Sequence, residues 1–170
     1  MRSSVRGIVA FTAAAFFTLS TTAIAASSGG STPRPSEPRP TPTSPAQQQS
    51  EDDFGKAEYL IKAERYEEAI PLLKNVVAKN PKDADAWNYL GFCSRKLGRT
   101  TDALDYYGKA LAIDPNHKGA HEYLGETYLL MKQPAKAQEQ LVILQGLCKG
   151  GCEEVDDLQQ AIADYKSANP

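Results

Sequence analysis

Residues 84–117 read ADAWNYLGFCSRKLGRTTDALDYYGKALAIDPNH, and this stretch decides the fold. Apolar residues recur at helical spacing on both sides of Gly98, and glycine commonly ends a helix. Pro115 follows the second apolar run at a place where a helix has to stop. The stretch therefore predicts two helices joined by a tight turn.

The same pattern recurs 34 residues away in both directions. Its positions in the middle unit are Trp87, Leu90, Gly91, Ala103, Tyr107, Ala110 and Pro115. The following unit places His121, Leu124, Gly125, Ala137, Leu141, Leu144 and Lys149 there. The preceding unit has Asp53, Lys56, Ala57, Ala69, Leu73, Val76 and Pro81. A fixed spacing of this length predicts a stack of similar units, each too small to bury its apolar face alone.

This pattern resembles the tetratricopeptide repeat family. The middle unit matches the family nearly throughout and departs at Ser94, where the family usually has Tyr. The two outer units match less completely. The resemblance implies an all-α solenoid of three helical hairpins, with repeats at about residues 50–83, 84–117 and 118–151.

A further helix is predicted over residues 153–166. Val155, Leu158, Ile162 and Tyr165 fall on one stripe of that helix. An open stack leaves an apolar face bare at its last hairpin. We therefore expect this segment to cap the stack, so that the folded domain spans residues 51–170.

Residues 1–25 have the layout of a secretory signal peptide. Arg2 and Arg6 precede the mostly apolar run Gly7–Leu19, and small residues follow at Ala23 and Ala25. The apolar run is shorter than the span of about 20 residues that crosses a bilayer. We expect cleavage after Ala25, no stable membrane insertion afterwards, and export to a bacterial periplasm or to the exterior.

Residues 26–50 are rich in Pro, Ser and Thr. Closely spaced prolines oppose both helix and sheet, and few apolar side chains are available to offset the cost of ordering. We interpret the segment as a disordered tether. A Pro-rich ligand for another domain is the alternative reading of the same composition.

Binding is the predicted function, on the concave face formed by the first helices of the hairpins. By family analogy, the concave-face residues are Asp85, Asn88, Tyr89, Phe92, Arg95, Lys96, Glu122, Tyr123 and Glu126. Their mixture of aromatic, amide and charged groups suits a peptide or protein segment. The alternative is a face that is merely solvated. The net charge of −2 gives no electrostatic case for nucleic acid.

One branch of the family clamps the carboxylate terminus of chaperones with Lys and Asn in the first repeat. This sequence has Phe54 and Glu58 at those places, which counts against such a clamp. The run Glu153–Asp156 reads EEVD like a chaperone tail, but it lies inside the chain and we interpret it as coincidental.

Cys148 and Cys152 flank two glycines that allow a tight reversal. In an exported protein the pair predicts a disulfide that holds the cap helix. A thiol-redox or metal-handling role for the pair is the alternative function. Cys93 has no partner in the sequence pattern and is expected to be a small buried residue.

His117 and His121 are four residues apart, a spacing that can hold a metal on a helix. No third ligand accompanies them, and we expect neither a metal site nor a cofactor. No nucleophile elbow, phosphate loop or supported acid–base pair occurs in the sequence, which favours a binding protein over an enzyme. Self-association through the open end at residues 51–62 is left open.

Overall fold

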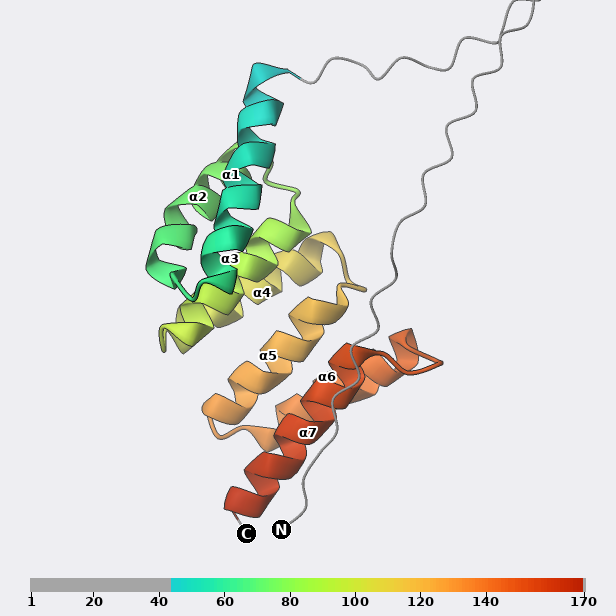
Figure 1. Ribbon diagram of the computed structural model, residues 1–170. Coiled ribbons are helices and arrows are strands. Elements are labelled where there is room, and N and C mark those ends of the chain that lie inside the picture. Colours follow the sequence, from blue (N-terminus) through green and yellow to red (C-terminus); the bar gives the residue numbers. More distant parts are fainter. Residues whose placement is uncertain (1–43, 170) are drawn as a thin grey trace, which may run out of the picture. The chain divides into compact units, whose positions relative to one another are not determined.

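The computed structural model describes residues 44–169, which form seven α-helices without a strand (Figure 1). The helices are α1 Pro45–Lys62, α2 Tyr66–Lys79, α3 Ala84–Lys96, α4 Thr100–Ile113, α5 Lys118–Leu130, α6 Pro134–Leu147 and α7 Glu153–Ala168. The predicted signal peptide and residues 26–43 of the predicted tether lie outside the described residues. No helix of the described part is long and apolar enough to cross a membrane.

The helices form three hairpins, α1/α2, α3/α4 and α5/α6, that follow one another through the stack (Figure 1). Each second helix packs on the first helix of the next hairpin. The final helix, α7, packs on α5 and α6, where the first helix of a further hairpin would lie. The predicted all-α solenoid with a terminal helix is confirmed.

The three hairpin turns share one backbone conformation. Glu64, Gly98 and Lys132 have φ angles of 58°, 75° and 57°, and they are spaced by 34 residues. The amide after each of them donates to a carbonyl five residues back, at 2.8 Å in all three turns. This is the hydrogen bond of a helix that ends on a left-handed residue. Gly98 was expected there, whereas the residues of the other two turns are not glycine.

The first helix begins earlier than the sequence pattern indicates. Pro45 occupies its first turn, where a missing N–H is harmless. Ser44 and Gln47 form a capping box, in which each side chain bonds the backbone of the other residue. The helix therefore includes residues 45–50, which we had assigned to the tether.

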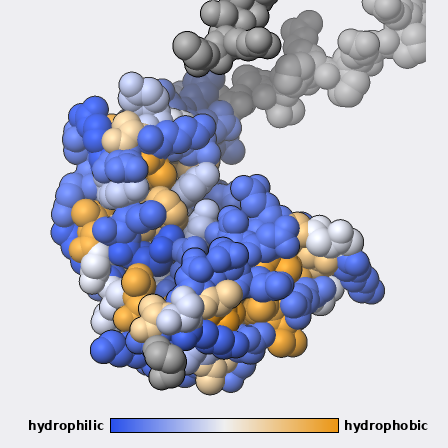
Figure 2. Space-filling model, turned by 60° about the horizontal axis from the view of Figure 1, so that its bottom comes forward, coloured by the Kyte–Doolittle hydropathy of each residue, from blue (hydrophilic) through white to orange (hydrophobic). Residues whose placement is uncertain are grey.

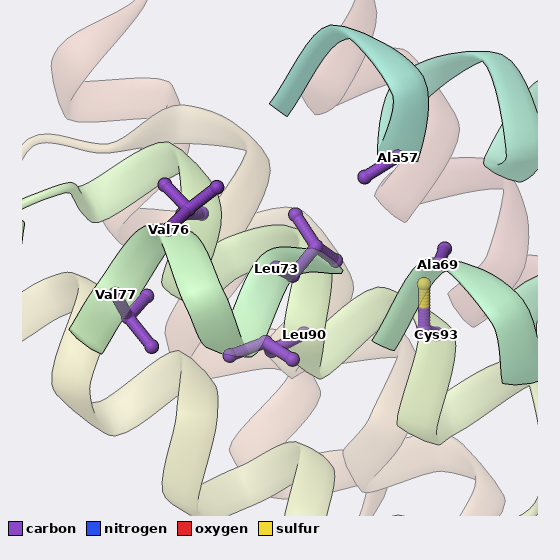
Figure 3. Packing of buried hydrophobic residues seen from close by; sticks show 8 residues of the cluster. Ala57, Ala69, Leu73, Val76, Val77, Leu90 and Cys93 are labelled. Carbon is purple, nitrogen blue, oxygen red and sulfur yellow. The ribbon is translucent and has the colours of Figure 1, made fainter. Parts of the chain in front are cut away.

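Small residues bring the helices of the first hairpin together. Ala57 and Ala69 are completely buried, and Leu73, Val76 and Leu90 fill the space beside them (Figure 3). Cys93 lies in the same cluster, and burial raises the pKa of its thiol to about 12. The expectation that Cys93 is a core residue is confirmed.

Two glycines of the first helices are required by close neighbours. A Cβ at Gly91 would clash with ring carbons of Tyr107, which is fully buried. Position 141, equivalent to Tyr107, holds the shorter Leu. In the third repeat it is Leu158 of α7 whose methyl groups come within 2.7 Å of a Cβ built at Gly125. The cap helix thus inserts a side chain into the hollow over Gly125.

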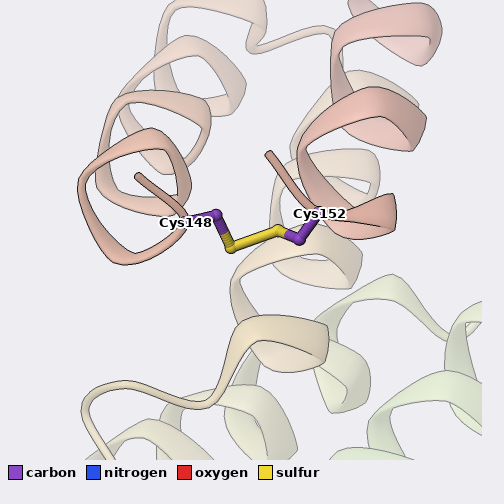
Figure 4. The surroundings of a disulfide bond; sticks show 2 residues. All are labelled: Cys148 and Cys152. Carbon is purple, nitrogen blue, oxygen red and sulfur yellow. A yellow bond between two sulfur atoms is a disulfide. The ribbon is translucent and has the colours of Figure 1, made fainter. Parts of the chain in front are cut away.

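A disulfide joins the last hairpin to the cap helix. Cys148 ends α6 and Cys152 precedes α7, and their Cα atoms are 5.8 Å apart (Figure 4). The reversal between them includes Gly151, whose φ is 86°. The bond therefore fixes α7 close to the point where α6 ends.

Candidate functional site

The first helices α1, α3 and α5 carry the residues predicted for the concave face. We call the surface formed by their exposed and half-buried side chains the first-helix face. It comprises Phe54, Glu58, Asp85, Tyr89, Phe92, Arg95, Lys96, Tyr123 and Glu126.

Aromatic rings form contacts across this face from one repeat to the next. Phe54 of α1 meets Tyr89 of α3 with ring centroids 5.6 Å apart. Phe92 of α3 meets Tyr123 of α5 at 5.1 Å and also contacts Tyr66 at 5.9 Å. All five rings are half-buried, so they offer apolar surface while remaining held in place.

Arg95 is committed to contacts within the protein. Its guanidinium pairs with Glu126 at 2.7 Å and lies 5.4 Å from the ring centroids of both Phe92 and Tyr123. Only 11% of the side chain is exposed. Arg95 was predicted to be part of the peptide-binding face, whereas the structure shows that its guanidinium links α3 to α5.

Asn88 is buried, with 6% of its surface exposed. Its Oδ1 has no hydrogen-bond partner among the described residues. The side chain points toward α5, because its Nδ2 lies 3.4 Å from a Cβ built at Gly119. Asn88 therefore belongs to the seam between two first helices and not to the open face where we expected it.

Phe54 and Glu58, which occupy the Lys and Asn positions of a carboxylate clamp, both interact with Tyr89. The Tyr89 hydroxyl donates to Glu58 at 3.1 Å, beside the contact between Phe54 and Tyr89. Burial and the nearby Glu58 raise the pKa of Tyr89 to about 12. This end of the face is aromatic and acidic, which disfavours an anionic ligand.

A depression of about 600 Å³ lies at the N-terminal end of this face. The early turns of α1, the end of α2 and the loop before α3 supply its walls. Its lining includes Gln47, Glu51, Phe54, Lys79, Asp83 and Asp85. Gln47 was not among the predicted site residues, because the sequence pattern places the start of the folded domain at residue 51. The sequence signal for the earlier helix start is the capping-box pair Ser44 and Gln47.

Glu122 is the least expected member of the site. Only 7% of its surface is exposed, and its carboxylate forms no ion pair within residues 44–169. Burial, together with the charges of Glu126, Asp157 and Glu154, raises the pKa of Glu122 to about 8. By contrast, Asp85 and Lys96 are exposed.

The two histidines have separate structural roles. His121 Nε2 lies 3.0 Å from the Pro115 carbonyl, which matches the bond from Trp87 Nε1 to the Pro81 carbonyl one repeat earlier. His121 Nδ1 lies 2.8 Å from Gln140 Oε1. His117 caps α5 by accepting from the Ala120 amide, and its Nε2 lies 3.0 Å from Asp85.

Sulfur and carboxylate come together at the start of α7. Atoms of Cys148, Cys152 and Glu154 lie within 4.8 Å of one another, and no other group of three potential metal ligands does so in the described part of the chain. The sulfurs are bonded to each other, so in this form neither offers a thiolate to a metal.

Hydrophilic side chains dominate the face in Figure 2, interrupted by separate apolar areas. The large apolar side chains that remain exposed include Leu130, Val142 and Ile143 at the C-terminal hairpin and Tyr59 on α1.

Two tetratricopeptide repeat models match the chain, over residues 54–118 and 94–145. The Hsp70-Hsp90 organizing protein of Triticum aestivum is 24% identical over 120 residues, which cover 71% of this chain and 21% of the relative. The chain thus spans about a fifth of the length of that relative.

Solved structures share the fold. The TPR2B domain of yeast Sti1 in its pHsp70 complex superposes with a TM-score of 0.66 at 17% identity, covering 72% of this chain and 99% of that one. The first TPR of Spaghetti (RPAP3), bound to the HSP90 peptide SRMEEVD, gives 0.62 at 16% identity, with 71% and 94% covered. The EEVD run of this chain forms the first turn of α7, with Val155 buried, and is not an extended tail.

Proposed function

Because the chain belongs to the tetratricopeptide repeat family, we propose that it is an exported scaffold that binds a peptide or protein segment on its first-helix face. The observation that carries this proposal is the run of contacts from Phe54 to Tyr89 and from Phe92 to Tyr123. These half-buried rings provide apolar contacts along three successive first helices. Solenoid proteins use such surfaces for binding. Half-buried aromatic side chains lose little conformational freedom when a partner binds.

The fold relatives support binding more than catalysis. Two of them are described in complex with a peptide or with pHsp70. This chain differs from a carboxylate clamp at Phe54 and Glu58, so its partner need not be a chaperone tail. The proposal therefore concerns the mode of binding and leaves the partner to experiment.

Export rests on two observations. The first 25 residues have the layout of a signal peptide, and Cys148 and Cys152 form a disulfide, a bond that persists in oxidising compartments. Mass spectrometry of the protein from a fractionated native cell tests this step. A mature chain beginning at Ala26 in the envelope fraction is expected; an intact chain in the cytoplasm would contradict export.

Binding is tested by site-specific photocrosslinking in the native host. A photoreactive residue replaces Lys96 on the first-helix face or, as the control, the exposed Gln138 on the second helix α6. We expect a discrete crosslinked partner from position 96 and none from position 138. Phe92→Ala and Tyr123→Ala should each reduce this crosslink while leaving the circular dichroism spectrum unchanged. Equal crosslinking from both positions would refute the assignment of the face.

A further inference from the structure

The cap helix brings a second set of acids beside α5. Glu122 and Glu126 lie on α5, and Glu154 and Asp157 on α7; we call these four residues the acidic seam. All three of the other acids act on Glu122 electrostatically. Glu126 is paired with Arg95, whereas Glu122, Glu154 and Asp157 form no ion pair within residues 44–169. Three of the four acids of the seam therefore have no ion-pair partner within the described residues.

The burial of Glu122 is a separate observation that points to a ligand at the acidic seam. The residue as a whole is more than nine-tenths buried, and burying an ionised carboxyl group without a partner is costly. Its oxygens are not among the fully buried polar atoms that lack a partner, so they keep some contact with solvent. The equivalent residue one repeat earlier, Asn88, is buried in the same way, but it is neutral.

We propose that the acidic seam binds the cationic end of a lysine or arginine side chain of the bound peptide, with Glu122 as its principal counter-charge. This inference rests on the proposed function, because the seam continues the first-helix face from α5 onto α7.

A metal ion fits the seam less well than an organic cation. In the described part of the chain, no three carboxylate oxygens of the seam lie within 4.8 Å of one another. Small divalent cations need several oxygens at short distances. An ammonium or guanidinium group spans a wider gap and can bond two carboxylates at once.

The ionisation of Glu122 determines how the affinity for a cationic peptide should change with pH. The groups that act on Glu122 from neighbouring helices are Arg95 on α3 and Asp157 and Glu154 on α7, with Glu126 on its own helix. Because its pKa is about 8 in the free protein, a cation that needs the carboxylate must displace a proton at neutral pH. The affinity for a cationic peptide is therefore expected to increase from about pH 6 to about pH 9, by about tenfold or more.

The experiment uses the full chain and a phage-displayed library of random peptides. Selected peptides are made with blocked termini, and each is also made with glutamine in place of its lysine or arginine. Affinities are measured by fluorescence anisotropy for the wild type and Glu122→Gln. The matched control is Glu139→Gln, which removes one exposed charge from the outer helix α6. Phe92→Ala reports whether a peptide uses the first-helix face at all.

We expect the selected peptides to share a Lys or Arg whose replacement by glutamine weakens binding about tenfold or more. Glu122→Gln should cause a similar loss and remove the pH dependence, while Glu139→Gln has little effect. Peptides that are lost with Phe92→Ala but bind Glu122→Gln unchanged would overturn this inference and leave the proposed function standing. An affinity that falls as pH rises would also overturn it, because Glu122 would then act as a protonated donor. Peptides unaffected by Phe92→Ala, or no selected peptide, would refute both.

Discussion

The hollow over Gly125 makes a quantitative prediction about how the cap helix is held. Replacing Gly125 by Ala places a methyl group 2.7 Å from both Leu158 methyl carbons, far inside the normal carbon separation of about 3.5–4.0 Å. Leu158 is completely buried and cannot turn aside into solvent. Alanine in a helix interior gains about 1 kcal/mol over glycine, whereas overpacking costs about 1–3 kcal/mol. Gly125→Ala is therefore expected to destabilise the fold by up to about 2 kcal/mol.

Gly125→Ala should change the free energy of unfolding in the opposite direction once Leu158 is shortened. Leu158→Ala alone should cost about 2–5 kcal/mol, as for other buried leucines. In that background the new methyl group meets no obstacle, so Gly125→Ala should stabilise by about 1 kcal/mol. The double-mutant cycle then gives a coupling energy of about 1–3 kcal/mol.

Urea unfolding followed by circular dichroism measures the cycle, with the disulfide intact in every variant. Gly108→Ala is the matched control, because nothing lies within 4 Å of a Cβ at that position of α4. It should stabilise by about 1 kcal/mol or less in either background, since only helix propensity changes. If Gly125→Ala had the same effect on stability with and without Leu158, the conclusion that Leu158 holds α7 by packing over Gly125 would be refuted.

Three further predictions address the turns, the seam and the disulfide. Lys132→Gly should raise the free energy of unfolding by about 0.5–1 kcal/mol because Lys132 has a φ of 57°, whereas Gly98→Ala should lower it; urea titration decides, and equal effects of one sign would contradict the turn geometry. Between the ordinary pKa of 4.5 and about 8, folded Glu122 holds more protons than unfolded Glu122, so stability should fall as pH rises, by at most about 1.4 kcal/mol per pH unit. Glu122→Gln should flatten this slope in thermal melts from pH 5 to pH 8, and an unchanged slope would count against the burial argument. Replacing Cys148 and Cys152 by Ser should cost about 2 kcal/mol of stability, as expected for a short loop, whereas a larger loss with altered helix content would show that the disulfide is needed to form α7.

The repeat and its hairpins could be predicted because small residues such as Gly91 inside a helix imply that another side chain packs closely against them. Gly91 pays a helix penalty that only a close neighbour offsets, and Tyr107 is that neighbour. The left-handed residues at positions 64 and 132 could not be predicted, since Glu and Lys carry no turn signal. In those turns the backbone follows the repeat although the side chains do not.

The candidate site was predicted in outline and less well in detail. The aromatic residues Phe92 and Tyr123 lie on the first-helix face as expected. Asn88 and Glu122 were expected to be open and are instead buried, because each occupies the side of its helix that faces the next first helix. Pattern spacing gives the face of a helix, but the burial of Glu122 depends on how closely α7 lies against α5. That distance depends on tertiary packing and is not encoded in any local window.

The attachment of α7 also determines where the stack loosens first. A linear array of repeats opens from its ends, because terminal units have a neighbour on one side only. At the C-terminal end, Leu158 and the disulfide hold α7 against the last hairpin, whereas α1 begins the described part of the stack without an equivalent lock. Amide hydrogen exchange should therefore be faster in α1 and α2 than in α5 and α6. Thermal breathing of this domain would then run from its N-terminal hairpin inward, so that the depression beside Phe54 is the part of the first-helix face most able to reshape around a partner.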